Sequence, residues 1–186
     1  MTPSWKSSGS SLLLAQKLQE QFPKGGGKPQ ADSSGGDPHK TMEPHQRLQV
    51  AVFFCQQLDP QQDLHSRELE HKWGSSVLFF PMHCSGRVEA LHLLKSLEEG
   101  ADRVLVLTCP EGRCRYREGS LRARKRLEYA RSLLEEIGLE PSRLELRAPP
   151  AQSPRHIARI LEPILEEPWE HGPCALKSGG AEGRNS

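Results

Sequence analysis

Residues 102–109 (DRVLVLTC) contain an uninterrupted apolar run that closes on a cysteine. Two further stretches have the same form and also end on cysteine: residues 48–55 (LQVAVFFC) and residues 75–84 (SSVLFFPMHC). Short continuous apolar runs are typical of strands that are buried on both faces of a parallel sheet. The carboxyl ends of such strands form the edge where open α/β sheets bind ligands. The sequence therefore predicts that three thiols meet at one edge of a sheet.

Helical patterns lie between these runs. We predict helices over residues 60–72, 85–99, 120–137 and from residue 153 onwards, and an edge strand over residues 143–147. Ser85 is expected to cap the second helix, and Gly100 and Gly138 to end the second and third. Ser153 and Pro154 suit the start of the last helix, in which Pro163 is expected to cause a kink or an end. This alternation predicts a single three-layer α/β domain with a parallel sheet of about four strands, similar to flavodoxin-like and Rossmann-like sheets.

The composition divides the 186 residues into one domain and two polar ends. Residues 1–46 are predicted to be a disordered extension in which residues 11–22 suit a short helix, residues 47–167 to fold, and residues 168–186 to form a flexible tail. A net charge of +1 indicates no particular partner. No stretch approaches the ~18 apolar residues of a membrane helix, and no secretory signal is evident. Five cysteines do not pair into a closed disulfide framework, so we expect a reducing cytoplasm.

A fourth cysteine follows the third strand closely. Cys109 and Cys114 bound the turn CPEGRC, in which Pro110 and Gly112 let the chain curl back. Amides of this turn and the start of the helix after the second strand are expected to stabilise negative charge there. Four converging thiols indicate a metal or iron–sulfur site, although structural zinc and plain burial of apolar cysteines remain alternatives. Cys174 lies outside this pattern, and we expect it to be a free, exposed thiol.

A basic stretch follows the turn. Residues 113–131 contain eight arginine and lysine residues, namely Arg113, Arg115, Arg117, Arg122, Arg124, Lys125, Arg126 and Arg131. Such a stretch suits a solvated helix face or a docking surface for an acidic redox partner. Nucleic acid is the weaker expectation, because aromatic residues are sparse there. Dinucleotide and phosphate-loop glycine motifs are absent from the sequence.

The segment from residue 84 to residue 119 carries a specific set of motifs. It contains CSGRVE at residues 84–89, EGAD at residues 99–102, VLV at residues 104–106 and CPEGRCRYREG at residues 109–119. This order resembles the delta subunit of methyl-viologen-reducing hydrogenase, in which CSGRV, a helix, EGAD-x-VLV and C-x-x-G-x-C-x-Y-x-E-G follow one another. The resemblance extends over roughly residues 48–167.

The resemblance implies an electron-transfer protein that carries a [2Fe-2S] cluster and catalyses no reaction by itself. Such subunits connect a hydrogenase or formate dehydrogenase to the flavin-containing subunit of heterodisulfide reductase, or are fused to such proteins. Relatives typically carry a C-x-x-C pair after the first strand, whereas this chain has Leu58 in place of the second cysteine. Four cysteines are left as the implied ligands: Cys55, Cys84, Cys109 and Cys114.

Residues beside these cysteines are expected to support the cluster. Gly86, Arg87 and Gly112 are predicted to line it, and His83 to have a structural or supporting role because adjacent strand residues point to opposite faces. No catalytic residue is predicted. Two other functions stay open: a zinc-stabilised or metal-free interaction module of the same fold, and a thiol redox protein that uses Cys109 and Cys114.

Overall fold

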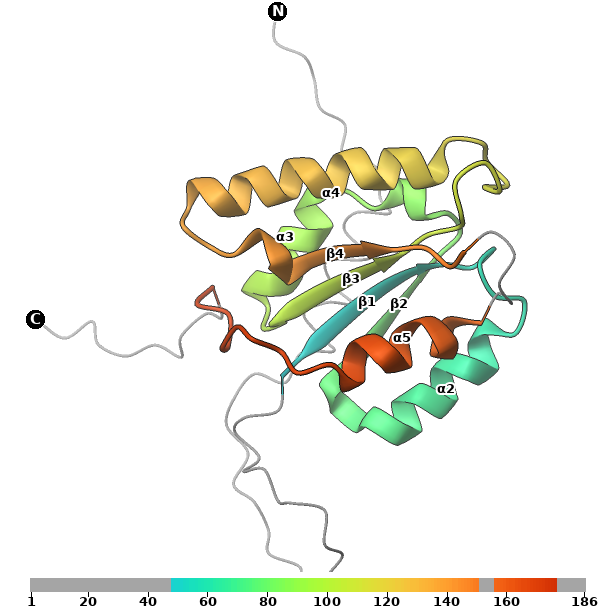
Figure 1. Cartoon of the computed structure of the whole chain (residues 1–186), viewed down its shortest axis with the longest axis horizontal. Helices are drawn as coiled ribbons and strands as arrows, with labels where there is room; N and C mark the ends of the chain where they lie inside the picture. The colour runs from blue at the N-terminus through green and yellow to red at the C-terminus, as the bar shows by residue number, and fades with distance from the viewer. Residues whose placement is uncertain (1–47, 151–155, 177–186) are drawn as a thin grey trace, which may run out of the picture.

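A four-stranded parallel sheet forms the middle layer of the computed structural model, which describes residues 48–150 and 156–176 (Figure 1). The strand order is β2-β1-β3-β4, with β1 (Val50–Cys55), β2 (Val77–Met82), β3 (Arg103–Leu107) and β4 (Leu144–Arg147). The helices are α2 (Gln62–Trp73), α3 (Ala90–Glu98), α4 (Gly119–Glu136) and α5 (Ile157–Glu166). Within the part of the chain that the structure describes, three 3₁₀ turns complete the elements: Gly74–Ser76, Ser85–Arg87 and Pro141–Arg143. The predicted α/β fold is confirmed.

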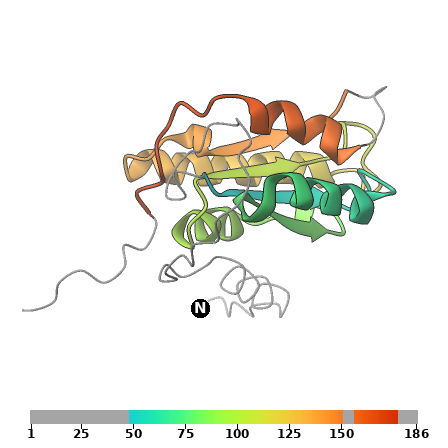
Figure 2. The same ribbon diagram turned by 90° about the horizontal axis from the view of Figure 1, so that it is seen from below.

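Strand β1 supplies side chains to two separate cores because it is buried along its whole length. Ala51 and Phe53 face the layer of α3 and α4, whereas Val52 and Phe54 face the layer of α2 and α5. Figure 2 shows α2 and α5 side by side across one face of the sheet. Burial on both faces explains why this strand is a continuous apolar run. The short strand β4 lies at the edge of the sheet, as its alternating sequence predicts.

The chain after Cys84 differs from the prediction. Ser85 does not cap a helix, because it begins the 3₁₀ turn Ser85–Arg87 and is buried. Helix α3 begins later, at Ala90, where Glu89 and His92 form a capping box. The backbone N–H of Glu89 donates to Nδ1 of His92 at 3.2 Å. These reciprocal hydrogen bonds satisfy backbone N–H groups at the start of the helix. The helix therefore begins after Glu89 and not after Ser85.

Helix α5 continues through Pro163 and ends at Glu166. Pro163 therefore does not end the helix, although it removes one backbone hydrogen bond. Burial of Ile157, Leu161 and Ile164 against the sheet anchors the helix on both sides of the proline. Ser153 and Pro154 lie outside the described residues, as do residues 11–22, for which a short helix is predicted.

The structure follows the chain beyond α5 as far as residue 176, where Cys174 is buried with 3% of its surface exposed. The expectation of an exposed thiol is therefore wrong. The backbone N–H of Cys174 donates to Oδ1 of Asp102 at 2.8 Å. The Trp169 ring stacks on the guanidinium of Arg103, whose Cζ atom lies 4.7 Å from the ring centroid. These contacts hold the segment against the amino-terminal edge of β3. Among the described residues, no helix combines the length and apolar character needed to cross a membrane.

Candidate metal centre

Cys55 and Cys109 meet at the point where the sheet grows to opposite sides of β1. The chain leaves β1 for β2 on one side, and β3 lies on the other side of β1. Cys55 is the last residue of β1, and Cys109 comes two residues after the end of β3. Their Sγ atoms lie 3.7 Å apart, and both side chains are buried. This point is where open α/β sheets commonly bind ligands.

The other two cysteines converge on the first residue of α4. A Cβ atom placed on Gly119 would lie 2.4 Å from Sγ of Cys84 and 2.8 Å from Sγ of Cys114. No side chain fits at residue 119 while both sulfurs keep these positions. Cys84 is buried, whereas Cys114 is half-buried and forms the outer side of the site. The missing Cβ of Gly119 thus leaves the space that the two sulfurs share.

The two pairs of thiols are neighbours, because Sγ of Cys55 lies 3.9 Å from the carbonyl oxygen of His83, the residue before Cys84. Burial raises the pKa of Cys84, and interactions with Cys55 and Cys114 raise it further. The structure therefore brings all four predicted ligands, from three strand ends and one loop, to the same edge of the sheet.

The pKa of the Cys55 thiol is lowered by its neighbours at this edge. A hydrogen bond from the Cys109 thiol lowers the pKa of Cys55 to about 6, against burial, which raises it. Backbone N–H groups of Ser85, Gln57 and Leu58 also lower the pKa. A thiolate is the form of cysteine that binds metal, so the polypeptide favours the ligand state of Cys55 at neutral pH.

Helix α4 holds the turn after β2 in place. Nη1 of Arg126 donates to the carbonyl oxygens of Gly86 at 2.7 Å and Val88 at 2.9 Å. Gly86 in turn packs directly on the backbone of Gly119. Arg126 and Gly119 were not singled out from the sequence as site residues. Gly119 had a signal, because it closes the motif C-x-x-G-x-C-x-Y-x-E-G, but Arg126 was only one of many cations in the basic stretch.

The other predicted supporting residues have different positions. Gly112 lies exposed in the turn with a φ of +72°, a conformation that favours glycine. Arg87 ends the 3₁₀ turn and is exposed. His83 is also exposed, and its carbonyl oxygen lies 3.9 Å from Sγ of Cys55. Helix α3 does not begin directly after Cys84 as expected, and the start of α4 lies at the thiols instead.

The thiol geometry fits tetrahedral metal coordination. Two thiolates on one tetrahedral ion, with bonds of about 2.3 Å, lie about 3.8 Å from each other. The Cys55–Cys109 separation of 3.7 Å agrees with this value. Cys84 and Cys114 supply a second pair at the same edge, which gives the four thiolates of a [2Fe-2S] cluster or of a structural zinc site.

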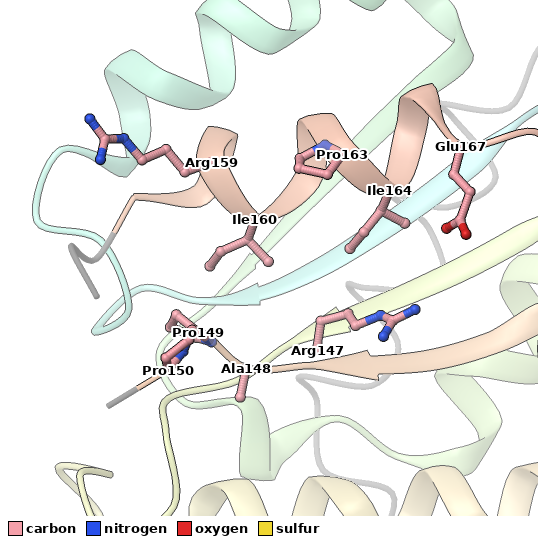
Figure 3. Close-up of a pocket in the computed structure, with 9 residues that line it drawn as sticks. All are labelled: Arg147, Ala148, Pro149, Pro150, Arg159, Ile160, Pro163, Ile164 and Glu167. Carbon is pink, nitrogen blue, oxygen red and sulfur yellow. The ribbon is translucent and has the colours of Figure 1, made fainter. Parts of the chain in front are cut away.

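A pocket elsewhere on the domain contains none of these cysteines. It lies between α5 and the chain that leaves β4 (Figure 3). Its lining residues are Arg147, Ala148, Pro149, Pro150, Arg159, Ile160, Pro163, Ile164 and Glu167. This pocket is therefore separate from the candidate metal centre.

Comparison with known proteins agrees with these features. The family model described as methyl-viologen-reducing hydrogenase, delta subunit, matches residues 50–167, which include all four clustered cysteines. The chain belongs to this family. The match covers the α/β domain from β1 to the end of α5, which is the same region that resembles the delta subunit in sequence.

The relatives described next are of two kinds, hydrogenase subunits and heterodisulfide reductase subunits. The iron–sulfur subunit of the vhu F420-non-reducing hydrogenase of Methanopyrus kandleri is 36% identical over 105 residues, 56% of this chain and 79% of the relative. The iron–sulfur subunit of the F420-non-reducing hydrogenase of Archaeoglobus profundus is 38% identical over 78 residues, 42% of this chain and 57% of the relative. The second kind is a much longer subunit of the ferredoxin:CoB-CoM heterodisulfide reductase of Methanosarcina mazei. It is 33% identical over 107 residues, 54% of this chain but only 14% of the relative.

Proposed function

We propose that the chain transfers single electrons through a [2Fe-2S] cluster bound by Cys55, Cys84, Cys109 and Cys114. The observation that carries the proposal is the 3.7 Å separation of the Cys55 and Cys109 sulfurs. The other two thiols converge on Gly119. Relatives named as iron–sulfur subunits support iron over zinc. When bound, such a cluster accepts and releases one electron reversibly.

The polypeptide has three tasks in this function. Its strand ends hold the thiols at fixed positions, since β1 and β3 are buried along their length. Arg126 and the glycine contact keep the turn after β2 against α4. Burial of Cys55, Cys84 and Cys109 keeps water away from three of the four ligands, and this shielding influences the reduction potential. We assign no substrate chemistry to the chain.

The proposed route of electrons runs between larger oxidoreductase subunits. One class of relatives consists of hydrogenase subunits, and the other belongs to heterodisulfide reductase. A short chain related to both suits a connection between a hydrogenase, or a formate dehydrogenase, and a heterodisulfide reductase-like flavoprotein. The match to 14% of the heterodisulfide reductase relative shows that this domain also occurs as one part of a longer protein.

The half-buried ligand indicates where a partner would dock. Cys114 lies in a loop, residues 110–118, that projects beyond the sheet edge, and we name this segment the Cys114 loop (Figure 1). Arg113 and Tyr116 are exposed there, the latter by 54%. Leu121 at the start of α4 is 46% exposed. The exposed cations would attract an acidic redox partner, and the exposed apolar groups would pack against it, next to Cys114, the most accessible proposed ligand.

A zinc-stabilised interaction module is the second candidate, because a 3.7 Å sulfur pair fits zinc as well as iron. In that case the domain would keep the fold and the partner surface but would transfer no electrons. Leu58 does not decide between the two functions. It is fully buried beside Cys55 and Cys109, where it adds to the core under α2 and α5.

Anaerobic purification of the full chain tests the proposed function. We expect a brown protein with visible charge-transfer absorption and, after chemical reduction, the paramagnetic resonance spectrum of a one-electron-reduced [2Fe-2S] cluster. A colourless protein that binds zinc would favour the interaction module. A colourless, metal-free protein that forms a reversible Cys109–Cys114 disulfide would favour the thiol redox alternative.

A further inference from the structure

Three buried or half-buried polar side chains meet a few residues beyond the cysteine edge. Asp59 follows the turn after β1 and is 1% exposed, His65 lies in the first turn of α2 and is 8% exposed, and His156 precedes α5 and is half-buried. One potential ligand atom from each lies within 4.8 Å of those of the other two. Asp59 and His65 are six residues apart, but His156 comes from the distant segment before α5, so no local motif indicates the whole cluster.

The hydrogen bonds within the cluster are incomplete. Nδ1 of His65 and Oδ2 of Asp59 lie 2.6 Å apart, which places a proton between them. The rings of His65 and His156 stack with centroids 3.5 Å apart and an interplanar angle of 15°. Among the described residues, Nδ1 of His156 is buried and has no hydrogen-bond partner. A buried polar atom without a partner is unfavourable by roughly 1–3 kcal/mol, so a ligand for this nitrogen would be stabilising.

The carboxylate is held firmly in position. Asp59 accepts hydrogen bonds from the backbone N–H of Gln61 at 2.9 Å and of Ile157 at 3.0 Å. Burial by itself raises the pKa of Asp59, but the hydrogen bonds from His65, Ile157 and Gln61 lower it below its ordinary value. Asp59 is thus a preorganised anion beside two imidazoles.

We propose that Asp59, His65 and His156 bind one divalent cation of the zinc type. A carboxylate and two imidazoles are a common set of three protein ligands, with a fourth position for water. The ion would replace the proton between Asp59 and His65, and that proton would leave to solvent. Tetrahedral ligand atoms with bonds of about 2.1 Å lie about 3.4 Å apart, so Asp59 and His65 separate slightly. The stacked ring of His156 turns about its Cβ–Cγ bond to direct a nitrogen at the ion.

The proposed ion would join three segments on one face of the sheet. Asp59 belongs to the loop after β1, His65 lies in α2 and His156 directly precedes α5. Helices α2 and α5 lie side by side (Figure 2). At the opposite end of the two helices, Nζ of Lys72 bridges Glu162 and Glu166 at 2.9 and 3.2 Å. The ion would thus fasten the ends of α2 and α5 nearest the sheet edge. Both helices cover the core that contains Cys55 and Cys109, so the ion would stabilise one wall of the thiol site.

This site is chemically distinct from the cysteine cluster because it offers nitrogen and oxygen in place of sulfur. Zinc bonds to nitrogen or oxygen are about 2.0–2.2 Å long, whereas zinc–sulfur bonds are about 2.3 Å. X-ray absorption at the zinc edge distinguishes these shells. The inference therefore stands or falls independently of whether the cysteines bind iron, zinc or nothing.

The test uses the full chain, purified anaerobically and treated with a chelator that removes weakly bound ions. Zinc is titrated by calorimetry into the wild type, His156→Gln and the control His71→Gln, which changes an exposed histidine of α2. We expect one zinc equivalent with a nitrogen–oxygen shell in the wild type and in the control. Binding by His156→Gln should be at least tenfold weaker, and proton release should accompany binding only where the site is intact.

Folding effects are separated by two measurements. The zinc-edge spectrum of the wild type requires no variant, and zinc should raise the urea midpoint of the wild type more than that of His156→Gln. Three results would overturn the proposal: no zinc binding beyond the cysteines in the wild type, a bound ion with a purely sulfur shell, or equal affinity of the wild type and His156→Gln.

Discussion

A Cβ atom on Gly86 would lie only 2.8 Å from the Cα of Gly119, so the turn after β2 and the first residue of α4 touch through their backbones. This contact determines where two thiols lie. Cys84 precedes Gly86 by two residues, and its Sγ and that of Cys114 both lie beside the Cβ position of Gly119. Two of the four proposed ligands, Cys84 and Cys114, are therefore positioned by a contact between two glycines.

Replacing Gly119 tests that arrangement. Alanine at the start of a helix normally stabilises a protein slightly relative to glycine. In Gly119→Ala we expect the opposite sign, a loss of about 1–3 kcal/mol in the free energy of unfolding, since the new methyl group overlaps both sulfurs. Bound metal should fall together with stability. Gly172→Ala is the matched control, because no atom lies within 4 Å of its new Cβ. Urea unfolding and metal analysis of both variants check the prediction, and full metal content in Gly119→Ala would contradict it.

Arg126 is expected to act by positioning the Cys84 turn. Arg126→Gln removes the charged donor to the carbonyls of Gly86 and Val88, so unfolding should become easier by about 1–3 kcal/mol. The proposed cluster should also dissociate faster under a chelator. Arg122→Gln, at an exposed position of the same helix, should change both quantities little. Equal chelation rates in the two variants would show that Arg126 does not hold the turn.

The metal-free protein should titrate near neutrality. The pKa of Cys55 is lowered to about 6 from an ordinary value of 9.0. Ionisation of this thiol therefore stabilises the folded chain increasingly as pH rises from about 6 to 9, and this stabilisation is lost as pH falls through 6. The slope has an upper bound of about 1.4 kcal/mol per pH unit. Thiolate absorbance and urea unfolding across this window should both show the step in wild type, and Cys55→Ser should lack it.

The Cys114 loop is expected to set the rate of electron transfer to an acidic partner. Arg113→Glu reverses one exposed charge beside the half-buried ligand, and it should slow reduction by an acidic redox protein several-fold at low ionic strength. The difference should shrink as salt screens the charges. Arg67→Glu makes the same charge change on α2, which covers the other face of the sheet, and should have little effect. Stopped-flow reduction at several salt concentrations measures both rates; equal rates would reject this docking face.

The sequence predicted the features that depend on local pattern. The buried strands follow from their apolar runs, and the cysteine edge follows because three of those runs end on cysteine. Features that depend on contacts between distant residues could not be predicted. Cys174 lies in a polar segment, and its burial depends on Asp102, 72 residues earlier. The role of Gly119 appears only when α4 is placed against the turn after β2. Ser85 suits a helix cap locally, but Glu89 and His92 form the better one.

Quantification of iron, acid-labile sulfide and zinc in one anaerobic preparation tests the central claim most directly. The account predicts two irons and two sulfides per chain in the wild type and in Cys174→Ala, which leaves the four clustered thiols intact. Cys109→Ser, which removes the partner of Cys55 at 3.7 Å, should lose most of both. Zinc without iron in the wild type, or undiminished iron and sulfide in Cys109→Ser, would contradict the account.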